Sequence, residues 1–450
     1  MAKNVETMMD KLVSLCKRRG FIYPSSEIYG GLGSIYDYGP LGAELKRNVK
    51  NFWWKWMVQR HEDIVGLESA ILMSPRIWEA SGHVAGFTDP LVDCKQCKHR
   101  FRADLLADQI AMKAGSGPQL RICPDCGGEL TEARQFNLMF KTFMGPVEDD
   151  ASVVYLRPET AQGIYVNFLN VLNSSRQKVP FGIAQIGKAF RNEITTENFI
   201  FRTREFEQME MQYFVRPGTD MEWFEFWKKD RQDYYRKIGI RPEKLRFHQH
   251  GSAELAHYAA AAFDIQYEFP FGWKELEGIH NRTDFDLSRH QEHSGKDISY
   301  FDDETRERYV PYIVETSAGV DRTMLAVLSD AYEEQALPKE DMRTVLHFHP
   351  AIAPIKAGIF PLVKREGMPD IARRIKDMLS PYYLVFYDEG GAVGRRYRRQ
   401  DEIGTPFCFT VDSETLQNET VTVRDRDSME QERIKIDDIL GFLFSRIENY

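Results

Sequence analysis

The feature that most constrains the fold is a pair of alternating segments on either side of a charged connector. Polar and apolar residues alternate along GIAQIGKAFRNE, residues 182–193, and again along REFEQMEMQYFV, residues 204–215. Alternation with a period of two is typical of β-strands, and the segment from Ile194 to Thr203 between them reads as a loop. The sequence therefore predicts a long antiparallel hairpin within an antiparallel sheet.

One face of this hairpin suits an extended ligand. Because strand side chains alternate, one face of the first strand is expected to carry Gln185, Gly187, Ala189, Arg191 and Glu193, and one face of the return strand Phe206, Gln208 and Glu210. Phe206 and Glu210 are then about 13 Å apart, a span that fits a flat aromatic ring at one end and a cation at the other. Arg202 and Arg204 in the connector suit phosphates. The alternative is a solvated hairpin held by salt bridges.

A second candidate site is the segment ETSAGVDR, residues 315–322. Glu315 and Ser317 fall on one face of a predicted strand end, and Gly319 allows the chain to turn close to a ligand. Arg322 then lies at the start of a predicted helix, where the helix dipole favours anions. The alternative is an ordinary junction of strand and helix with a surface arginine.

Four of the six cysteines form two Cys-x-x-Cys pairs. Cys94 and Cys97 are followed, after 25 residues, by Cys123 and Cys126. Each pair places two thiolates on one tight turn, and four thiolates suit a tetrahedral Zn²⁺ ion of the structural type. We therefore predict a zinc site, with four unligated core cysteines as the alternative.

Length and composition limit the class of protein. The chain has 450 residues, enough for two or three domains of about 150 residues. No apolar run approaches the roughly 20 residues of a membrane crossing, and the N-terminus has no continuous apolar stretch. Few cysteines argue against a disulfide scaffold. These observations exclude a membrane or secreted protein and predict a cytoplasmic one. The net charge of -9 gives no indication of a polyanionic partner.

The chain divides into two predicted parts. Residues 1–342 form the larger part, with an insertion at 93–130 that contains the cysteine pairs and a second, mainly helical insertion at 219–263. From about Thr344, strand-like runs such as YYLVFYD alternate with helix-like runs such as IARRIKDML. This alternation predicts a separate α/β domain at 343–450.

The motifs, in this order, resemble those of class II aminoacyl-tRNA synthetases. FRNE at 190–193 with its Arg-rich loop resembles motif 2, GVDR at 319–322 resembles motif 3, and the helix and strand that end at Pro75 resemble motif 1. More specifically, five segments resemble the dimeric form of glycyl-tRNA synthetase: YPSSEIYGGLGSIYDYGPLG, RPETAQGIY, FRTREFEQME, KELEGIHNRTDFDL and ETSAG. The resemblance spans essentially the whole chain.

The resemblance implies an α+β fold with a class II antiparallel-sheet catalytic domain, a zinc-ribbon-like insertion and a C-terminal α/β anticodon-binding domain. It implies a homodimeric glycine–tRNA ligase that forms glycyl-adenylate from glycine and ATP with Mg²⁺ and then charges tRNA(Gly). A motif 1 interface would lie around Trp53, Trp54 and Pro75, although such an aromatic helix is also typical of plain core. Two other classes are a synthetase-like accessory or regulatory protein without aminoacylation, and a zinc-ribbon nucleic-acid-binding protein.

The resemblance also implies which residues bind ATP. Arg191 and Arg322 would be catalytic: Arg191 would hold the α-phosphate, and Arg322 would lie across the adenine ring from Phe206. Glu193 would accept from the adenine amino group, and Glu275 would hold Mg²⁺ or ATP. The full set comprises Arg191, Asn192, Glu193, Phe201, Arg202, Thr203, Arg204, Glu205, Phe206, Glu275, Leu276, Gly319, Val320, Asp321 and Arg322.

For glycine, the resemblance implies a site around three carboxylates and a serine. Glu159, Glu210 and Glu315 at one buried point would repel one another without a cation, so such a site suits a small ammonium group. Selectivity would come from leaving no room for a methyl group; for each Glu, the alternative is a structural ion pair with a neighbouring Arg. The full set comprises Arg102, Glu159, Phe206, Glu207, Gln208, Met209, Glu210, Glu315, Thr316, Ser317, Ala318 and Gly319.

A candidate RNA contact lies in the C-terminal domain. Residues 343–450 hold 16 Lys plus Arg against 17 Asp plus Glu, so any RNA contact must come from a local cluster. The densest cluster is GRRYRRQ, which contains Arg395, Arg396, Tyr397, Arg398 and Arg399. Guanidinium groups grip phosphates, and an aromatic ring among them offers a platform for unpaired bases. A solvated helix face with paired arginines is the alternative.

Overall fold

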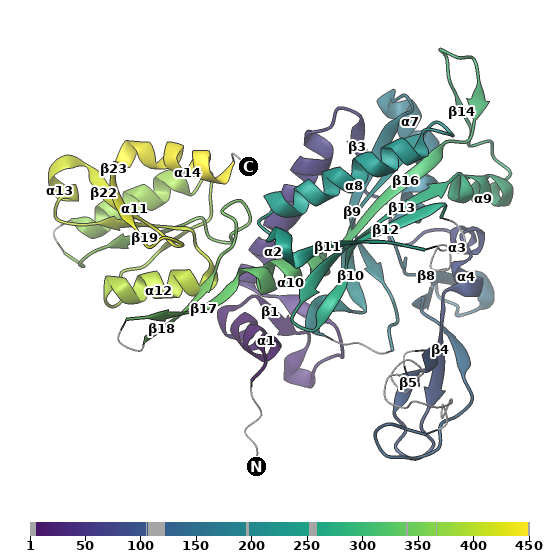
Figure 1. Cartoon of the computed structure of the whole chain (residues 1–450), viewed down its shortest axis with the longest axis horizontal. Helices are drawn as coiled ribbons and strands as arrows, with labels where there is room; N and C mark the ends of the chain where they lie inside the picture. The colour runs from purple at the N-terminus through teal and green to yellow at the C-terminus, as the bar shows by residue number, and fades with distance from the viewer. Residues whose placement is uncertain are drawn as a thin grey trace.

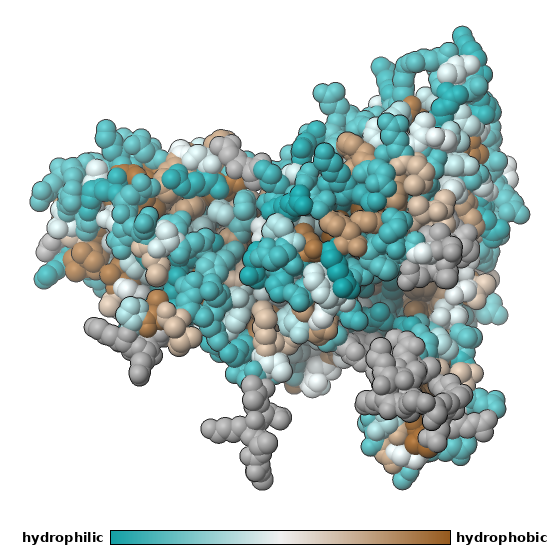
Figure 2. Space-filling view, viewed as in Figure 1, coloured by the Kyte–Doolittle hydropathy of each residue, from teal (hydrophilic) through white to brown (hydrophobic). Residues whose placement is uncertain are grey.

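The computed structural model describes residues 6–104, 106, 122–194, 198–251, 259–338, 341–365 and 367–448. A central sheet with its helices forms the larger part of the molecule, and the C-terminal segment forms a second body beside it (Figure 1). The insertion with strands β4 and β5 projects from the opposite end of the larger part (Figure 1). On the face in Figure 2 the surface is mainly hydrophilic, with apolar residues in small groups.

The central sheet has seven strands in the order β11-β12-β13-β16-β10-β9-β3. All neighbours are antiparallel except β3 and β9. The strands are β3 (Ile64–Gly66), β9 (Phe181–Phe190), β10 (Glu205–Val215), β11 (Leu245–Gln249), β12 (Ala261–Phe269), β13 (Gly272–Thr283) and β16 (Tyr312–Gly319). The predicted hairpin is therefore confirmed, as β9 and β10, and it lies in an antiparallel sheet.

Helices α2 (Pro40–Trp54), α8 (Asp220–Lys237) and α10 (Val320–Ala331) pack on this sheet and close its core. Helix α2 begins with Pro40 in its first turn, a position where the missing N–H costs nothing. Gly42 allows α2 to approach Phe21 closely, since a Cβ at Gly42 would lie 1.8 Å from the Phe21 carbonyl oxygen. Trp53 is completely buried in this core, so it is not available to an interface between subunits.

Smaller elements surround the sheet. In the first hundred residues these are α1 (Met8–Arg19), β1 (Ile22–Pro24), β2 (Tyr36–Tyr38), α3 (Pro75–Ala80) and α4 (His83–Gly86). Later elements are β7 (Lys141–Phe143), β8 (Val153–Tyr155), α6 (Ala161–Tyr165), α7 (Phe168–Ser175), α9 (Phe285–Ser294), β14 (Tyr300–Phe301) and β15 (Arg308–Tyr309). The helices α6, α7 and α9 contribute to a second apolar cluster beside the sheet.

The first insertion is built on a three-stranded sheet, with β4 (Thr88–Asp93) between β5 (Arg100–Arg102) and β6 (Arg134–Asn137). Beyond this sheet, two turns bring the four cysteines together around a small core of Val92, Leu106 and Leu130.

The prediction that residues 219–263 are mainly helical is wrong for the second half of that segment. Among the described residues of this segment, α8 and the short 3-10 helix Pro242–Lys244 are helical, whereas β11 and the start of β12 are strands of the central sheet. The burial of alternate residues from Phe263 onward shows the strand period.

The C-terminal part has its own core around a mixed five-stranded sheet in the order β20-β19-β21-β22-β23. Its strands are β19 (Ala357–Pro361), β20 (Val385–Tyr387), β21 (Phe407–Val411), β22 (Thr420–Asp425) and β23 (Gln431–Lys435). Its helices are α11 (Met368–Leu379), α12 (Val393–Ile403), α13 (Thr415–Asn418) and α14 (Ile439–Ile447). The hairpin of β17 (Tyr332–Leu337) and β18 (Asp341–Leu346) connects the two parts. Among the residues described above, no helix combines the length and apolar character that a membrane crossing requires.

Candidate active site

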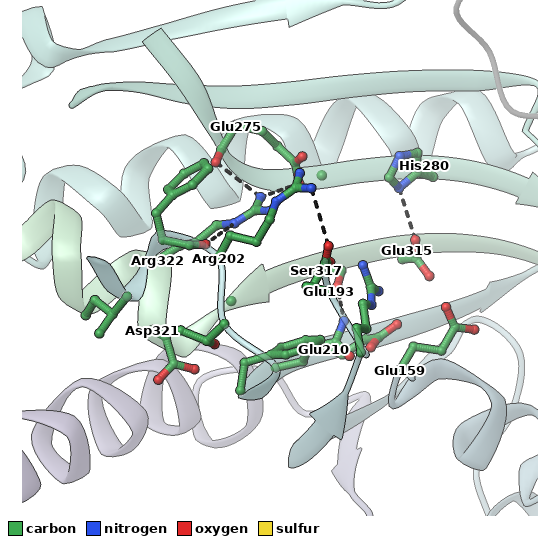
Figure 3. Close-up of a pocket in the computed structure, with 18 of the residues that line it drawn as sticks. Glu159, Glu193, Arg202, Glu210, Glu275, His280, Glu315, Ser317, Asp321 and Arg322 are labelled. Carbon is green, nitrogen blue, oxygen red and sulfur yellow. Dashed lines mark hydrogen bonds and ion pairs between the residues drawn. The ribbon is translucent and has the colours of Figure 1, made fainter. Parts of the chain in front are cut away.

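A pocket of about 930 Å³, its open mouth included, lies on one face of the central sheet. Arg202 and Arg322 lie at one end of this pocket, near Glu275, and Glu159, Glu210 and Glu315 lie at the other end (Figure 3). Its walls come from β10, β13, β16, the start of α10 and the segment that connects β9 to β10.

Strand register explains why these side chains meet. Glu210 of β10 lies opposite Ser317 of β16, and Glu315 of β16 lies opposite His280 of β13. Directly opposed residues of antiparallel strands point to the same face of the sheet. The sheet thus gathers polar side chains from three strands on one face.

At the acidic end, Glu210 and Glu315 are buried and share one hydrogen-bond donor. The Gln212 side-chain amide donates to Glu210 Oε1 and to Glu315 Oε2, each at 2.8 Å. Thr160 Oγ1 donates to the other oxygen of Glu210. Glu159 approaches from the loop before α6, where His83 Nε2 lies 3.4 Å from its Oε2 atom. The three predicted carboxylates therefore surround one end of the pocket (Figure 3).

These three carboxyl groups differ in their preference for charge. Burial opposes ionisation, but His83 lowers the pKa of Glu159 to about 2. Burial also opposes ionisation of Glu315, but Arg282 and His280 hold its pKa well below the usual range. For Glu210, burial and the charges of Glu315 and Glu159 all raise the pKa well above the usual range. Of these three carboxyl groups, Glu210 is therefore the one that resists ionisation.

Two residues of this end had no predicted role. His280 Nδ1 lies 3.0 Å from Glu315 Oε1, and Arg282 Nη1 lies 3.4 Å from the same atom. Arg282 is also held by Asp286, at 2.7 Å. Both line the pocket with Gly278 and Ile200. The period-two spacing of Gly278, His280 and Arg282 is the sequence signal for their common face.

The other end of the pocket combines arginines with aromatic rings. The Arg191 guanidinium carbon lies 5.3 Å from the centre of the Phe206 ring, and Arg191 Nε donates to the Pro158 carbonyl at 3.0 Å. The Arg322 guanidinium lies 4.6 Å from the Phe201 ring and forms a 3.3 Å ion pair with Glu275. The positive charge of Arg322 lowers the pKa of Glu275, and this effect outweighs burial, which raises it. The Glu275 carboxylate is therefore ionised.

Most of the predicted residues line the pocket. They are Glu159, Arg191, Glu193, Phe201, Arg202, Thr203, Phe206, Gln208, Glu210, Glu275, Glu315, Ser317, Gly319, Asp321 and Arg322. The structure does not place the rest there: Arg102, Asn192, Arg204, Glu205, Glu207, Met209, Leu276, Thr316, Ala318 and Val320.

Strand alternation explains four of these ten differences. Glu207, Met209, Thr316 and Ala318 lie between the lining residues of β10 and β16, so they belong to the opposite face. Arg204 instead donates to the Gly33 and Glu193 carbonyls, at 2.6 and 2.9 Å, and holds the chain behind the pocket.

Arg102 lies on β5 of the insertion. It forms ion pairs with Asp89 at 3.1 Å and with Asp104 at 2.7 Å. In this conformation its guanidinium is therefore occupied outside the pocket.

The four cysteines form a compact cluster, with all sulfur atoms within 4.8 Å of one another. Cys94 Sγ lies 3.5 Å from Cys126 Sγ, and Cys97 Sγ lies 3.7 Å from Cys123 Sγ. The backbone N–H of Cys97 points to Cys94 Sγ at 3.4 Å, a contact that favours a thiolate. This donor set fits a tetrahedral thiolate-ligated ion.

The predicted arginine cluster forms the helix α12, but its members differ in exposure. Arg396 is buried and donates to the Pro361 and Asp388 carbonyls, at 2.7 and 3.0 Å, so its guanidinium is held within the domain. Tyr397 is partly buried, with its hydroxyl 2.6 Å from Thr410 Oγ1. Arg395 and Arg399 are exposed, and Arg398 is partly buried.

Comparison with known families agrees with this architecture. Residues 143–331 match the tRNA synthetase class II core domain (G, H, P, S and T), and residues 351–446 match the anticodon binding domain. The fold and the pocket therefore define a class II aminoacyl-tRNA synthetase.

Similar proteins of nearly equal length show which family of this class the chain belongs to. The chain is 60% identical over 447 residues to a glycine–tRNA ligase of Treponema denticola, with 98% of each chain covered. It is 56% identical to that of Borreliella burgdorferi, with the same coverage, and 55% identical over 466 residues to that of Clostridium perfringens, with 99% of each chain covered. The chain belongs to the glycine–tRNA ligase family.

Replacing Glu210 with Gln should stabilise the protein without ligands. The folded protein holds the Glu210 proton more tightly than the unfolded chain does, so stability is lost as the pH rises above 4.5. Gln removes this loss while retaining the partners Gln212 and Thr160. At pH 7 the thermal midpoint should rise by several degrees, since about 1 kcal/mol corresponds to about 2–4 °C. The gain should shrink toward pH 4.

The matched control is Glu159→Gln. His83 favours the charge of Glu159, so the same substitution there should leave the midpoint unchanged or lower it. An equal gain in both variants would contradict the assignment of excess negative charge to Glu210.

Proposed function

We propose that this chain activates glycine with ATP to form glycyl-adenylate and pyrophosphate, and then transfers the glycyl group to the 3′-terminal ribose of tRNA(Gly). The observation that carries this proposal is the polarity of the pocket. Three carboxylates stand at one end and arginines with aromatic rings at the other, a pattern that suits an ammonium group and a nucleotide bound end to end.

For the nucleotide, positioning and charge neutralisation provide most of the catalysis of an in-line attack at the α-phosphate. Arg191 holds the α-phosphate and orients the attacking glycine carboxylate. Phe206 stacks on adenine, with Arg322 across the ring, and Arg202 steadies the phosphates. Glu193 accepts from the adenine amino group. Support comes from the position of all five side chains on the pocket wall.

Glu275 is the candidate ligand for Mg²⁺, which would bring ATP phosphates and carboxylate oxygens together. Support for this assignment is its ionised carboxylate on the same wall as Arg322.

For glycine, the ammonium group supplies a positive charge beside Glu210, between the carboxylates of Glu159 and Glu315. Ser317 lies between them and the nucleotide, with its hydroxyl 3.3 Å from the Gln208 amide nitrogen. The hydrogen bonds from Gln212 and Thr160 hold Glu210 and Glu315 in place. Selectivity for glycine then comes from steric closure.

Beyond this pocket, we propose a homodimer of two-part subunits, with a catalytic part at 1–342 and an anticodon-binding part at 343–450. Support for the dimer is the resemblance of α2 and β3 to motif 1. All six cysteines are unpaired, which is typical of a reducing compartment and supports a cytoplasmic location.

The four-cysteine cluster holds one structural Zn²⁺ ion in this proposal. Four thiolates close the coordination sphere, so the ion stabilises the insertion and takes no part in the reaction. For tRNA, Arg395, Arg398 and Arg399 of α12 supply phosphate contacts on the anticodon-binding part.

Arg191→Ala and Arg322→Ala should each abolish adenylate formation in a folded protein. Each removes a positive group that faces the reacting phosphates or the adenine ring. We expect glycine-dependent ATP–pyrophosphate exchange to fall by at least about 10²-fold, the effect of removing one preorganised donor. Arg373→Ala, on the exposed side of α11, is the control for loss of an arginine. Wild-type exchange in either folded active-site variant would refute its assigned role.

Protein purified without chelators should contain about one Zn per chain. Elemental analysis measures the metal directly, and Cys123→Ser should lose it because a three-thiolate set binds more weakly. Cys408→Ser removes a buried thiol far from the cluster and should retain the metal. Absence of metal from protein with reduced thiols would contradict the proposal.

Removing Arg395 and Arg398 together should raise the KM for tRNA and leave glycine-dependent exchange unchanged. Each lost phosphate contact should also reduce the salt dependence of tRNA binding by about one unit of slope. Lys178→Ala with Arg308→Ala is a control that removes two exposed charges from the catalytic part. If the charging kinetics of the Arg395/Arg398 variant equal those of the wild type, the RNA contact lies elsewhere on the domain.

A further inference from the structure

A buried lysine of α2 lies directly behind the nucleotide end of the pocket. The Lys46 side chain is 12% exposed, and its Nζ lies 2.8 Å from Glu207 Oε2 and 3.0 Å from Asp321 Oδ1. The same Nζ lies 4.1 Å from the centre of the Tyr38 ring. Lys46 thus joins two carboxylates that belong to different elements, β10 and α10.

The two carboxylates are linked to each other as well. Asp321 Oδ2 accepts a hydrogen bond of 2.8 Å from the backbone N–H of Glu207. The Tyr38 hydroxyl donates to the other oxygen of Asp321. Glu207 also forms an ion pair with Lys50, one turn further along α2, with 3.0 Å between Glu207 Oε1 and Lys50 Nζ. Two lysines and two carboxylates therefore form a neutral cluster, defined here as Lys46, Lys50, Glu207 and Asp321.

Two members of this cluster are adjacent in sequence to residues at the nucleotide end of the pocket. Glu207 follows Phe206 in β10, and Asp321 precedes Arg322 at the start of α10. Asp321 points away from the arginines of the pocket, toward the N-terminal segment drawn in purple (Figure 3). The bond from the Glu207 backbone to Asp321 sets the spacing between β10 and α10, and Lys46 neutralises the two acids that this spacing brings together.

We propose that Lys46 is a positioning residue for adenylate formation. Through its ion pairs with Glu207 and Asp321, Lys46 fixes the positions of Phe206 and Arg322 relative to each other. The inference rests on the proposed function. Lys46 does not line the pocket, so it acts through its partners. Without its charge, Glu207 and Asp321 repel each other in a region with little water. Phe206 and Arg322 then shift apart, and a misplacement of about 1 Å reduces a rate by about 10²-fold.

The charge state of the cluster agrees with this role. Burial opposes the charge on Lys46, but Asp321 and Glu207 raise its pKa above the ordinary value. Burial likewise opposes ionisation of Glu207, whereas Lys46 and Lys50 lower its pKa. The ion pairs are therefore kept over the neutral pH range.

The experiment compares Lys46→Met, Lys46→Arg and the control Lys50→Met in glycine-dependent ATP–pyrophosphate exchange. Lys50 pairs with Glu207 from the same helix but is 29% exposed, so its loss is screened by water. For folded Lys46→Met we expect kcat to fall at least about tenfold and the KM for ATP to rise, with the KM for glycine unchanged. Lys46→Arg should restore most of the rate, and Lys50→Met should resemble the wild type.

A merely structural role would lower the thermal midpoint and the active fraction without separating ATP from glycine. Wild-type kcat and KM for ATP in folded Lys46→Met, or an equal rise in both KM values, would overturn the inference. If Lys46→Met does not fold, Tyr38→Phe removes a hydrogen bond to Asp321 without leaving a buried charge. It should raise the KM for ATP selectively, and unchanged ATP kinetics would overturn the inference.

The two proposals fail in different ways. Absence of glycine-dependent exchange in the wild-type protein would refute the proposed function. An active wild type with an equally active Lys46→Met variant would refute the positioning role alone.

Discussion

The pairing of β10 with β9 on one side and β16 on the other is the constraint on which the rest of the molecule depends. It places Phe206, Gln208 and Glu210 on one face, and it aligns Glu210 with Ser317. A slip of one residue would turn every one of these side chains to the opposite face. Because the opposite face is filled by Met209, Met211 and Ala318 in the main core, the apolar packing fixes the register of the polar site.

The carboxylates on the two faces of this sheet differ in how their charges are balanced. On the pocket face, burial and the charges of Glu315 and Glu159 oppose the ionisation of Glu210. On the other face, Glu207 and Asp321 are matched by Lys46 and therefore contribute to structure. Functional sites often carry such unfavourable charge, and the surrounding fold provides the stability to hold it.

Several features were predictable because they depend on local chemistry. The alternation of residues around Arg191 and Phe206 indicated the hairpin, and the spacing of Cys94, Cys97, Cys123 and Cys126 indicated a common cluster. Other features were not predictable because they depend on partners distant in the chain. Arg282 joins the site only through strand pairing. Arg396 is buried where it donates to the carbonyls of Pro361 and Asp388, and both of these residues lie outside its own helix.

The sequence by itself determined the antiparallel hairpin and the two-part organisation, since the period and spacing of residue types can be seen along the chain. The resemblance of its motifs to a known family indicated most of the residues around the pocket. Only the tertiary structure decided which partners each face of those strands meets. Glu207 and Glu210 are both acidic residues of one strand, yet Glu207 meets Lys46 and Glu210 meets Glu315. The physical reason is that a strand presents successive side chains to opposite faces, and what each face meets is set by segments more than a hundred residues away.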